Sequence, residues 1–327
     1  MTIKSRILAT AAVGLLATVS ACGASDDGGS SGGGGGDAYD IGIVQFSSSE
    51  ETTEAAIQGY VDYAEEQGWS TSKVDPQGSV DKAISAMNDF VQKGVDAIVV
   101  AVFPSETLTA GVRAATAAGI PVISIAGGTA EGVPVSADSG APNATEVSQL
   151  LVDDMGDEGG AALVLGYKSG LPCLGREEEL NSILDGTDIE VTREEVPIPG
   201  QVEGGTQFAQ AWLAKNPEGS GNLAIWACFD DPALGAISAL RQAGRDDVKV
   251  YGINGTPAAV QAVEDGDMRA TAYLDAPAGG KAIGEKTAEV IEAGPEMAPE
   301  TVPIPTFLVT EDSLAEFAET YPEAAAR

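Results

Sequence analysis

Residues 95–126 read VDAIVVAVFPSETLTAGVRAATAAGIPVISIA and contain a strand, a helix and a second strand. Residues 95–103 are almost wholly apolar, which is typical of a parallel strand that is covered on both faces. Residues 106–118 predict a helix that ends at Gly119, and residues 120–126 predict the next strand. Because two parallel strands joined by a helix form a right-handed crossover, this stretch predicts a doubly wound α/β fold.

The same alternation of short apolar runs and amphipathic stretches continues on both sides of this unit. Residues 39–46 predict a buried strand at the start of the folded region. A second cycle begins with a strand at residues 161–167, includes a core strand at residues 223–229 and ends with a long helix at residues 279–293. Two such runs predict two lobes, each built on a doubly wound parallel sheet.

The composition excludes several classes of function. The chain has 327 residues, a length that favours about two domains. Its 50 acidic residues outnumber 17 lysines and arginines, so the formal net charge is −33. That charge disfavours binding to nucleic acid or to anionic lipid, whose phosphates attract cations. The chain contains no histidine, so catalysis and metal ligation by histidine are excluded.

The N-terminus predicts export and a lipid anchor. The apolar run at residues 7–19 is shorter than the roughly 20 residues that a membrane-spanning helix needs, so residues 1–21 are interpreted as a signal peptide. Residues 19–22, VSAC, resemble the bacterial lipoprotein box, in which the cysteine, here Cys22, carries a diacylglycerol. An ordinary signal peptide that ends near a cysteine is the alternative. Residues 22–38 are rich in glycine and predict a flexible tether.

Five motifs of the folded region follow one another in a characteristic order. They are IGIV, GVDAIVV, AAGIPVI, DDPALGAISAL and YGINGTP. In this order they resemble the sugar-binding periplasmic proteins of ABC importers, of the ribose-binding type, from residue 39 to the C-terminus. Residues 230–240 followed by residues 250–257 are the most specific part of the resemblance.

The resemblance implies a periplasmic binding protein-like fold of type I, in which three strand crossings join two lobes that close on a ligand by hinge motion. Carried over to this chain, it places the crossings near residues 137–139, 274–275 and 302–306. The N-terminal lobe is then expected to comprise residues 39–138 plus 275–304, and the C-terminal lobe residues 139–274 plus 305–327.

Ligands of open parallel sheets lie outside the carboxyl ends of the strands, where the strand order reverses. At those ends the sequence offers carboxylates and an amide that can bind sugar hydroxyls, and aromatic rings that can pack on sugar C–H surfaces. The candidate ligand-binding residues are Phe46, Glu50, Phe103, Phe229, Asp230, Asp231, Asn254 and Asp275.

Several of these positions also have structural interpretations. Asp231 precedes Pro232, which is the pattern of a helix N-cap, so a cap and a ligand contact remain equally open. Asn254 could serve a turn, although the family places a ligand-binding Asp or Asn at that position. Glu50 could be a solvated charge at a helix start. Trp226 lies inside a strand and is assigned to the core rather than to the cleft.

The sequence departs from the ribose-type pattern at three places. Residues 52–53 are threonines where the family carries an aromatic pair, and residues 126–128 (AGG) replace an Asp-Arg pair. A further ligand arginine would fall near Leu174, with Arg176 at a neighbouring basic position. These departures predict that the arginines that hold ring hydroxyls are absent. They favour an amino sugar, another amine-bearing solute or a sugar held by neutral groups, whereas an anion would need Lys168 or Arg176 to point inward.

The remaining cysteines suit an exported protein. With Cys22 lipidated, Cys173 and Cys228 form an even pair in an oxidising compartment, which favours a disulfide over two buried thiols. The resemblance implies that the strands before them are neighbours. A bridge would then hold the loop at residues 169–174 beside the cleft.

Together these features predict a lipid-anchored, extracytoplasmic, monomeric solute-binding protein that passes a small polar ligand, a sugar or sugar derivative, to an ABC permease. A lipoprotein that senses a solute and signals to a membrane receptor without transport is the alternative. We expect no enzyme activity, because no histidine is available and the sequence marks no acid opposite Asp230 and Asp231. We also expect no cofactor, no metal site and no nucleic acid partner, and membrane contact only through the lipid anchor.

Overall fold

The computed structural model describes residues 38–325. The predicted signal peptide, the lipidated Cys22 and residues 22–37 of the predicted tether lie outside these residues. The described residues belong to one compact unit that contains two six-stranded sheets. Within residues 38–325, no helix combines the length and the apolar character that a bilayer crossing requires.

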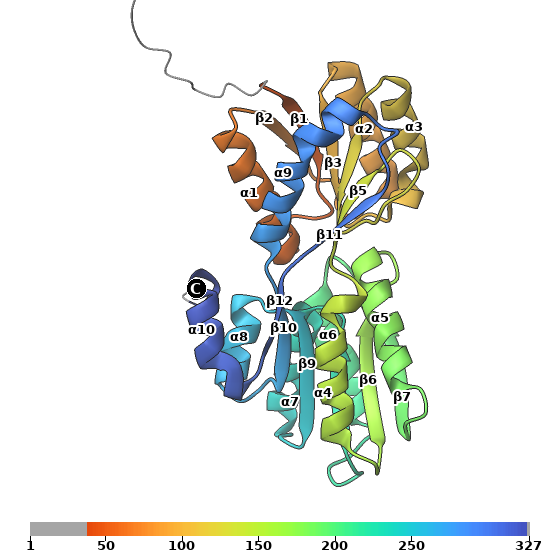
Figure 1. Ribbon diagram of the computed structural model, residues 1–327. Helices are drawn as coiled ribbons and strands as arrows, with labels where there is room; N and C mark the ends of the chain where they lie inside the picture. Colours follow the sequence, from red (N-terminus) through yellow and green to blue (C-terminus); the bar gives the residue numbers. More distant parts are fainter. Residues whose placement is uncertain (1–37, 326–327) are drawn as a thin grey trace, which may run out of the picture. The chain divides into compact units, whose positions relative to one another are not determined.

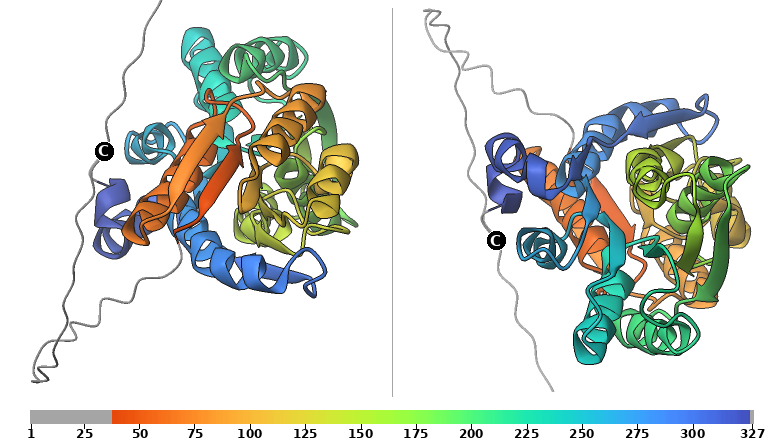
Figure 2. Two further views of the ribbon diagram at one scale, coloured as in Figure 1. Left: turned by 90° about the horizontal axis from the view of Figure 1, so that it is seen from above. Right: turned by 90° about the horizontal axis from the view of Figure 1, so that it is seen from below.

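The N-terminal sheet has the strand order β11-β5-β4-β3-β1-β2, and every neighbouring pair is parallel. Helices α1 and α9 pack together on one face, and α2 and α3 pack together on the other (Figures 1 and 2). Its strands are β1 (Asp40–Val44), β2 (Ser70–Val74), β3 (Ala97–Ala101), β4 (Val122–Ile125), β5 (Val135–Asp138) and β11 (Glu300–Pro303). Its helices are α1 (Glu51–Glu66), α2 (Val80–Lys93), η1 (Ser105–Leu108), α3 (Thr109–Ala117) and α9 (Ala276–Ala293).

The C-terminal sheet has the equivalent order β12-β10-β9-β8-β6-β7, in which only β12 runs antiparallel to its neighbour. Its strands are β6 (Gly160–Gly166), β7 (Ile189–Glu195), β8 (Leu223–Ala227), β9 (Val248–Asn254), β10 (Ala270–Leu274) and β12 (Thr306–Val309). Its helices are η2 (Ala141–Asn143), α4 (Thr145–Met155), α5 (Leu171–Leu184), α6 (Gln201–Leu213), α7 (Asp230–Ala243), α8 (Pro257–Glu264), η3 (Glu311–Ser313), α10 (Leu314–Thr320) and α11 (Pro322–Ala325). The two sheets confirm the predicted α/β fold of two doubly wound lobes.

The described chain passes from one sheet to the other after β5, after β10 and between β11 and β12 (Figure 1). The last passage is a single extended segment, broken at Ile304 and Pro305, that adds one strand to each sheet. Pro305 has no amide hydrogen to donate, and its carbonyl accepts a hydrogen bond from the amide of Asp275 (3.0 Å) in the second passage. This bond ties two of the three connections together.

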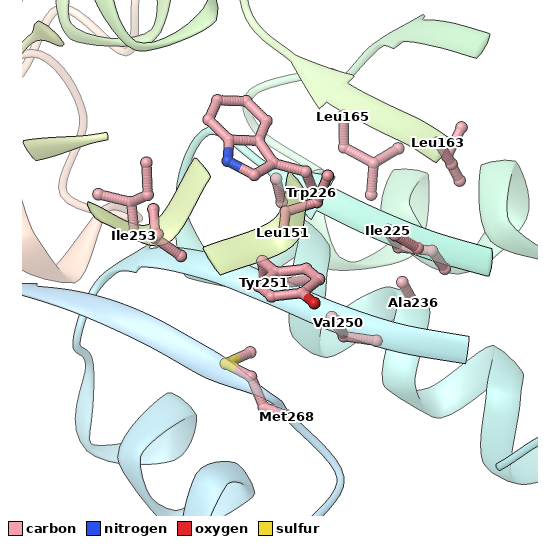
Figure 3. Close-up of a cluster of buried hydrophobic side chains, with 14 of the residues drawn as sticks. Leu151, Leu163, Leu165, Ile225, Trp226, Ala236, Val250, Tyr251, Ile253 and Met268 are labelled. Atoms are coloured by element: carbon pink, nitrogen blue, oxygen red, sulfur yellow. The ribbon is translucent and has the colours of Figure 1, made fainter. Parts of the chain in front are cut away.

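Glycine helix ends and buried apolar clusters explain why these residues form these elements. Helix α7 ends at Gly244, whose φ of 64° gives the left-handed C-cap that glycine adopts without strain. In the C-terminal half, one apolar cluster fills the space around β8 and β9, with Trp226 and Tyr251 at its centre (Figure 3). Trp226 is fully buried, which confirms its assignment to the core rather than to the cleft.

Candidate ligand-binding site

A cavity of about 70 Å³ lies where the carboxyl ends of the two sheets face each other. Its wall combines residues that follow strands β1, β3, β4, β6, β8 and β9 with residues of the three connections. The lining residues are Phe46, Glu50, Thr52, Thr53, Ala56, Val102, Ile125, Ala126, Ser139, Tyr167, Gly170, Pro172, Cys173, Arg176, Ile198, Phe229, Asn254, Leu274, Ala276 and Ile304. The wall therefore includes four of the eight predicted ligand residues, namely Phe46, Glu50, Phe229 and Asn254.

Glu50 supplies a carboxylate from the N-terminal half. It is the N-cap of α1, where it accepts hydrogen bonds from the amide (2.8 Å) and the hydroxyl of Thr53. Burial raises the pKa of Glu50, and the bonds from Thr53 offset part of that effect. Both bonds use Oε2, and within residues 38–325 no hydrogen bond involves Oε1. Glu50 is thus a cap and a cavity residue at once, rather than a solvated charge.

Arg176 supplies a guanidinium from the C-terminal half, on helix α5. Its side chain is only 3% exposed, and it donates from Nε to the carbonyl of Ser139 (2.9 Å) and from Nη1 to the carbonyl of Cys228 (2.7 Å). Burial lowers the pKa of Arg176 to about 10, although the negative charge of Glu50 acts in the opposite direction. Among the described residues, no hydrogen bond involves Nη2. The sequence left open whether Lys168 or Arg176 points inward, and the packing of α5 turns Arg176, rather than Lys168, toward the cavity.

Asn254 ends strand β9 and also lines the cavity. Its φ of 122° lies in a region that few residues other than glycine adopt. The residue is 7% exposed, and no hydrogen bond of the described chain involves its side-chain amide. The turn and the ligand interpretations of Asn254 are therefore compatible, because the unusual backbone directs an unpaired amide to the wall.

Asp230 lies behind the wall rather than on it. It is completely buried and accepts hydrogen bonds from the amide of Thr256 (2.7 Å) and from the hydroxyl of Thr271 (2.7 Å). Burial raises the pKa of Asp230 to about 6, and the two threonines offset part of that effect. A Cβ at Gly252 would lie 2.4 Å from Oδ1, so the glycine makes room for the carboxylate. Asp230 joins β10 and the segment after β9 to α7 and leaves no oxygen unpaired for a solute.

The other predicted residues surround the cavity without lining it. Phe103 is buried and packs on Phe46, with ring centroids 4.8 Å apart. Asp275 is the N-cap of α9, where it accepts from the amide of Ala278 (3.2 Å). These two side chains support the wall and the second connection, respectively.

Asp231 belongs to a contact between the two halves. It does not cap α7; its Oδ2 accepts a hydrogen bond from the side chain of Gln201 (2.9 Å). The same amide nitrogen of Gln201 donates to the carbonyl of Ser49 (3.2 Å), which follows β1. Burial raises the pKa of Asp231, and the bond from Gln201 offsets part of that effect. Gln201, which the sequence did not single out, thus connects the C-terminal half to the N-terminal half.

A second cavity of about 360 Å³ adjoins the first, because Thr52, Asn254, Leu274 and Ala276 line both. Its remaining wall includes Asp275 and the C-terminal residues 320–324.

Within residues 38–325, no group of three or more acidic or cysteine side chains is arranged to hold a metal ion.

Cys173 and Cys228 form a disulfide, as the sequence favoured over two free thiols. Cys173 lies in the first turn of α5 and lines the cavity, and Cys228 directly follows β8. The carbonyl of Cys228 is also the acceptor for Arg176. The bridge therefore fixes the start of α5 beside β8 and, with it, the helix that carries the cavity arginine.

Comparisons with known proteins agree with this architecture. A family model described as a periplasmic binding protein domain matches residues 41–295. A xylitol-binding protein of Mycolicibacterium smegmatis is 29% identical over 83% of this chain and 76% of its own length. A putative rhizopine-binding protein of Rhizobium meliloti is 29% identical over 79% of this chain and 86% of its own. An ABC transporter solute-binding protein from Mycobacterium smegmatis, solved with bound glycerol, has a TM-score of 0.75 at 27% identity and covers 86% of this chain and 97% of its own.

Proposed function

Because the chain belongs to the periplasmic binding protein family, whose model it matches over most of its length, we propose that it captures a small sugar or polyol between its two halves for an ABC permease. The family match confirms the resemblance noted in the sequence. It also makes the chain a solute-binding protein rather than an enzyme, as predicted.

One observation carries the proposal. Polar atoms from both halves face one cavity and have no partner in the described protein: Oε1 of Glu50 from one side, and Nη2 of Arg176 and the amide of Asn254 from the other. A solute that fills the cavity would cover these atoms and must then pair with them, because buried polar groups are normally hydrogen-bonded. Hydroxyl groups can both donate and accept, so a polyol would satisfy a carboxylate, a guanidinium and an amide together.

The same arrangement supports a closure mechanism. A ligand that contacts both halves binds the closed state more tightly than the open one. It shifts the equilibrium toward the closed state by that difference in binding free energy. The bond from Gln201 to the carbonyl of Ser49 adds a direct contact between the halves. In our proposal the permease recognises the closed form, with residues 39–138 plus 275–304 as one lobe and residues 139–274 plus 305–327 as the other.

The relatives support a small, hydroxylated solute. Two of them are described as binding xylitol or rhizopine, and one solved structure holds glycerol. In our proposal Phe46 and Phe229 pack on the C–H surfaces of the solute, while Glu50, Arg176 and Asn254 bind its hydroxyls. Asp230, Asp231, Phe103 and Asp275 hold these residues in place.

We further propose that the protein is a monomer held on the extracytoplasmic face of the membrane by a lipid on Cys22. Replacement of that residue (C22A) should move the protein from the membrane fraction to the soluble fraction and abolish incorporation of labelled palmitate. Unchanged labelling of the C22A variant would contradict the anchor and leave the binding function intact.

Isothermal titration calorimetry tests the binding function. The full chain, purified from membranes in detergent, is titrated with xylitol, allitol, myo-inositol, glycerol and ribose, and at least one should bind. The substitution R176M should then weaken binding at least about 30-fold, since loss of one partner in a buried charged hydrogen bond costs roughly 2–5 kcal/mol. The matched control R113M changes an exposed arginine of α3 and should bind normally.

A second variant protects the test against misfolding of R176M. The substitution N254G removes the amide and keeps a residue that tolerates a positive φ. Full affinity in both R176M and N254G would place the ligand elsewhere and overturn the proposed site.

A further inference from the structure

The wall of the cavity is mostly carbon. Its large apolar side chains come from both halves and from the connection between β11 and β12: Phe46, Ile125, Ile198, Phe229, Leu274 and Ile304. Each of them is buried except Ile198, which is half-buried. Much of any bound solute must therefore face hydrocarbon.

The polar groups of the wall cover less of it than the apolar ones do. Glu50, Arg176 and Asn254 have the unpaired atoms described above, and no ion pair joins Glu50 to Arg176 among the described residues. The hydroxyls of Thr52, Thr53, Ser139 and Tyr167 also belong to the wall, so it can bind several hydroxyls but not a solute that is polar on every side. A further hydroxyl that pointed at the apolar wall would lose its hydrogen bonds to water and gain none, which costs about 1–3 kcal/mol.

Three stretches near the cavity supply no charged side chain. Residues 52–53 are threonines, residues 126–128 are AGG and residue 174 is a leucine.

We propose that the solute is a small sugar or polyol in which an apolar substituent replaces at least one hydroxyl, such as a deoxy, methyl or thioalkyl group. The hydroxyls of the solute meet Glu50, Arg176 and Asn254, and its apolar substituent packs on the carbon wall. This assignment rests on the proposed function and names the chemical class of its ligand.

Matched sugar pairs test the assignment. Calorimetry on the detergent-purified full chain compares D-galactose with 6-deoxy-D-galactose and D-ribose with 5-deoxy-D-ribose. In at least one pair the deoxy sugar should bind about tenfold or more tightly, since one such group in an apolar pocket is worth about 10–200-fold. The substitution F229N should reduce or reverse that preference.

The variant is chosen so that it folds. Phe229 is the N-cap of α7, and asparagine is among the residues most favoured at that position. The matched control V191N changes a well-exposed valine on β7 and should keep the preference. If F229N does not unfold cooperatively on heating, L274Q makes the same change at another point of the wall.

The outcomes separate the two proposals. Equal binding within both pairs, tighter binding of the fully hydroxylated sugar, or an unchanged preference in F229N and L274Q would overturn the apolar-substituent assignment and leave the binding function in place. Failure of every sugar and polyol in both titrations to bind would overturn the proposed function, and the assignment with it.

Discussion

Glu50 and Asp230 are carboxylates at strand ends in the two halves of the molecule, and they have different roles, although their strands, β1 and β8, are not counterparts in the two sheet orders. Each follows a core strand, β1 or β8, and each lies at the start of the next helix. Burial raises the pKa of both carboxyl groups. Asp230 has both oxygens bonded inside the protein, whereas Glu50 leaves one oxygen toward the cavity. A buried carboxylate with a raised pKa is therefore a ligand candidate only where its oxygens are not already bonded.

The difference arises from the neighbours that each half supplies. Thr256 and Thr271 come from the segments after β9 and within β10, and both reach Asp230 from outside its own helix. Among the described residues, the carboxylate of Glu50 is hydrogen-bonded only by Thr53 of the first turn of α1. One carboxylate thus holds several elements together, and the other caps one helix.

The largest effect should come from D230A, which leaves two buried donors without an acceptor. We expect the free energy of unfolding to fall by about 2–6 kcal/mol, at about 1–3 kcal/mol for each of the two unpaired donors. Urea denaturation at pH 5 measures this loss of stability. At that pH the carboxyl of Asp230 in the wild type is mostly protonated, so the cost of burying a charged carboxylate does not offset the lost hydrogen bonds. The control D231A removes a half-buried carboxylate with one partner, Gln201, and should lose less than about 1 kcal/mol. Equal losses of stability in D230A and D231A would show that Asp230 holds the fold together no more strongly than Asp231 does.

Glu50 should show the opposite pattern, in which binding changes and stability does not. In E50Q the side-chain oxygen can still accept from the amide of Thr53, so the free energy of unfolding should change by less than about 1 kcal/mol. Solute affinity should fall about tenfold, because hydrogen bonds to charged groups are stronger than neutral ones by about 1–1.5 kcal/mol. Calorimetry measures the affinity, with E65Q on the exposed side of α1 as the control. A large loss of stability without loss of affinity would make Glu50 a purely structural residue.

The raised pKa of Asp230 predicts a pH dependence that D230N should lack. The folded protein binds the proton more tightly than the unfolded chain does, since the pKa rises from 3.8 to about 6. This contribution to stability is complete below pH 3.8 and is lost as the pH rises through about 6. Between pH 7.5 and pH 5, the wild-type protein should gain about 1–1.5 kcal/mol relative to D230N. Denaturation curves at both pH values measure the difference, and parallel pH profiles would contradict it.

The smallest effect should come from Q201A, which removes the bond between the halves without touching the cavity wall. We expect stability to fall by about 0.5–1.5 kcal/mol and the unliganded protein to adopt more open conformations. Small-angle X-ray scattering without ligand should then give a larger radius of gyration than for wild type. The control Q210A changes an exposed glutamine on the same helix. If Q201A and wild type scatter identically, the contact does not hold the halves together.

Much of the fold could be predicted because its signals are local. Apolar runs and glycine helix ends set the strands and helices around residues 95–126, and the structure has β3, α3 and β4 there. The unit of β5 and α4 between residues 127 and 160 was not predicted, because β5 has only four residues and two of them are polar. The antiparallel β12 also lacked a local signal, since its pairing depends on a chain that has crossed from the other sheet.

The sequence by itself determined the fold class, the cysteine pair and the edge of the sheets at which a ligand could lie, because strand periodicity and residue spacing are properties of the local chain. Only the tertiary structure decided which side chains reach the cavity. Arg176 turns onto the wall through the carbonyls of Ser139 and Cys228, and Asp230 turns away from it through Thr256 and Thr271. All four partners are distant in sequence, and a side chain at a strand end or in a helix points toward whichever distant group satisfies its charge.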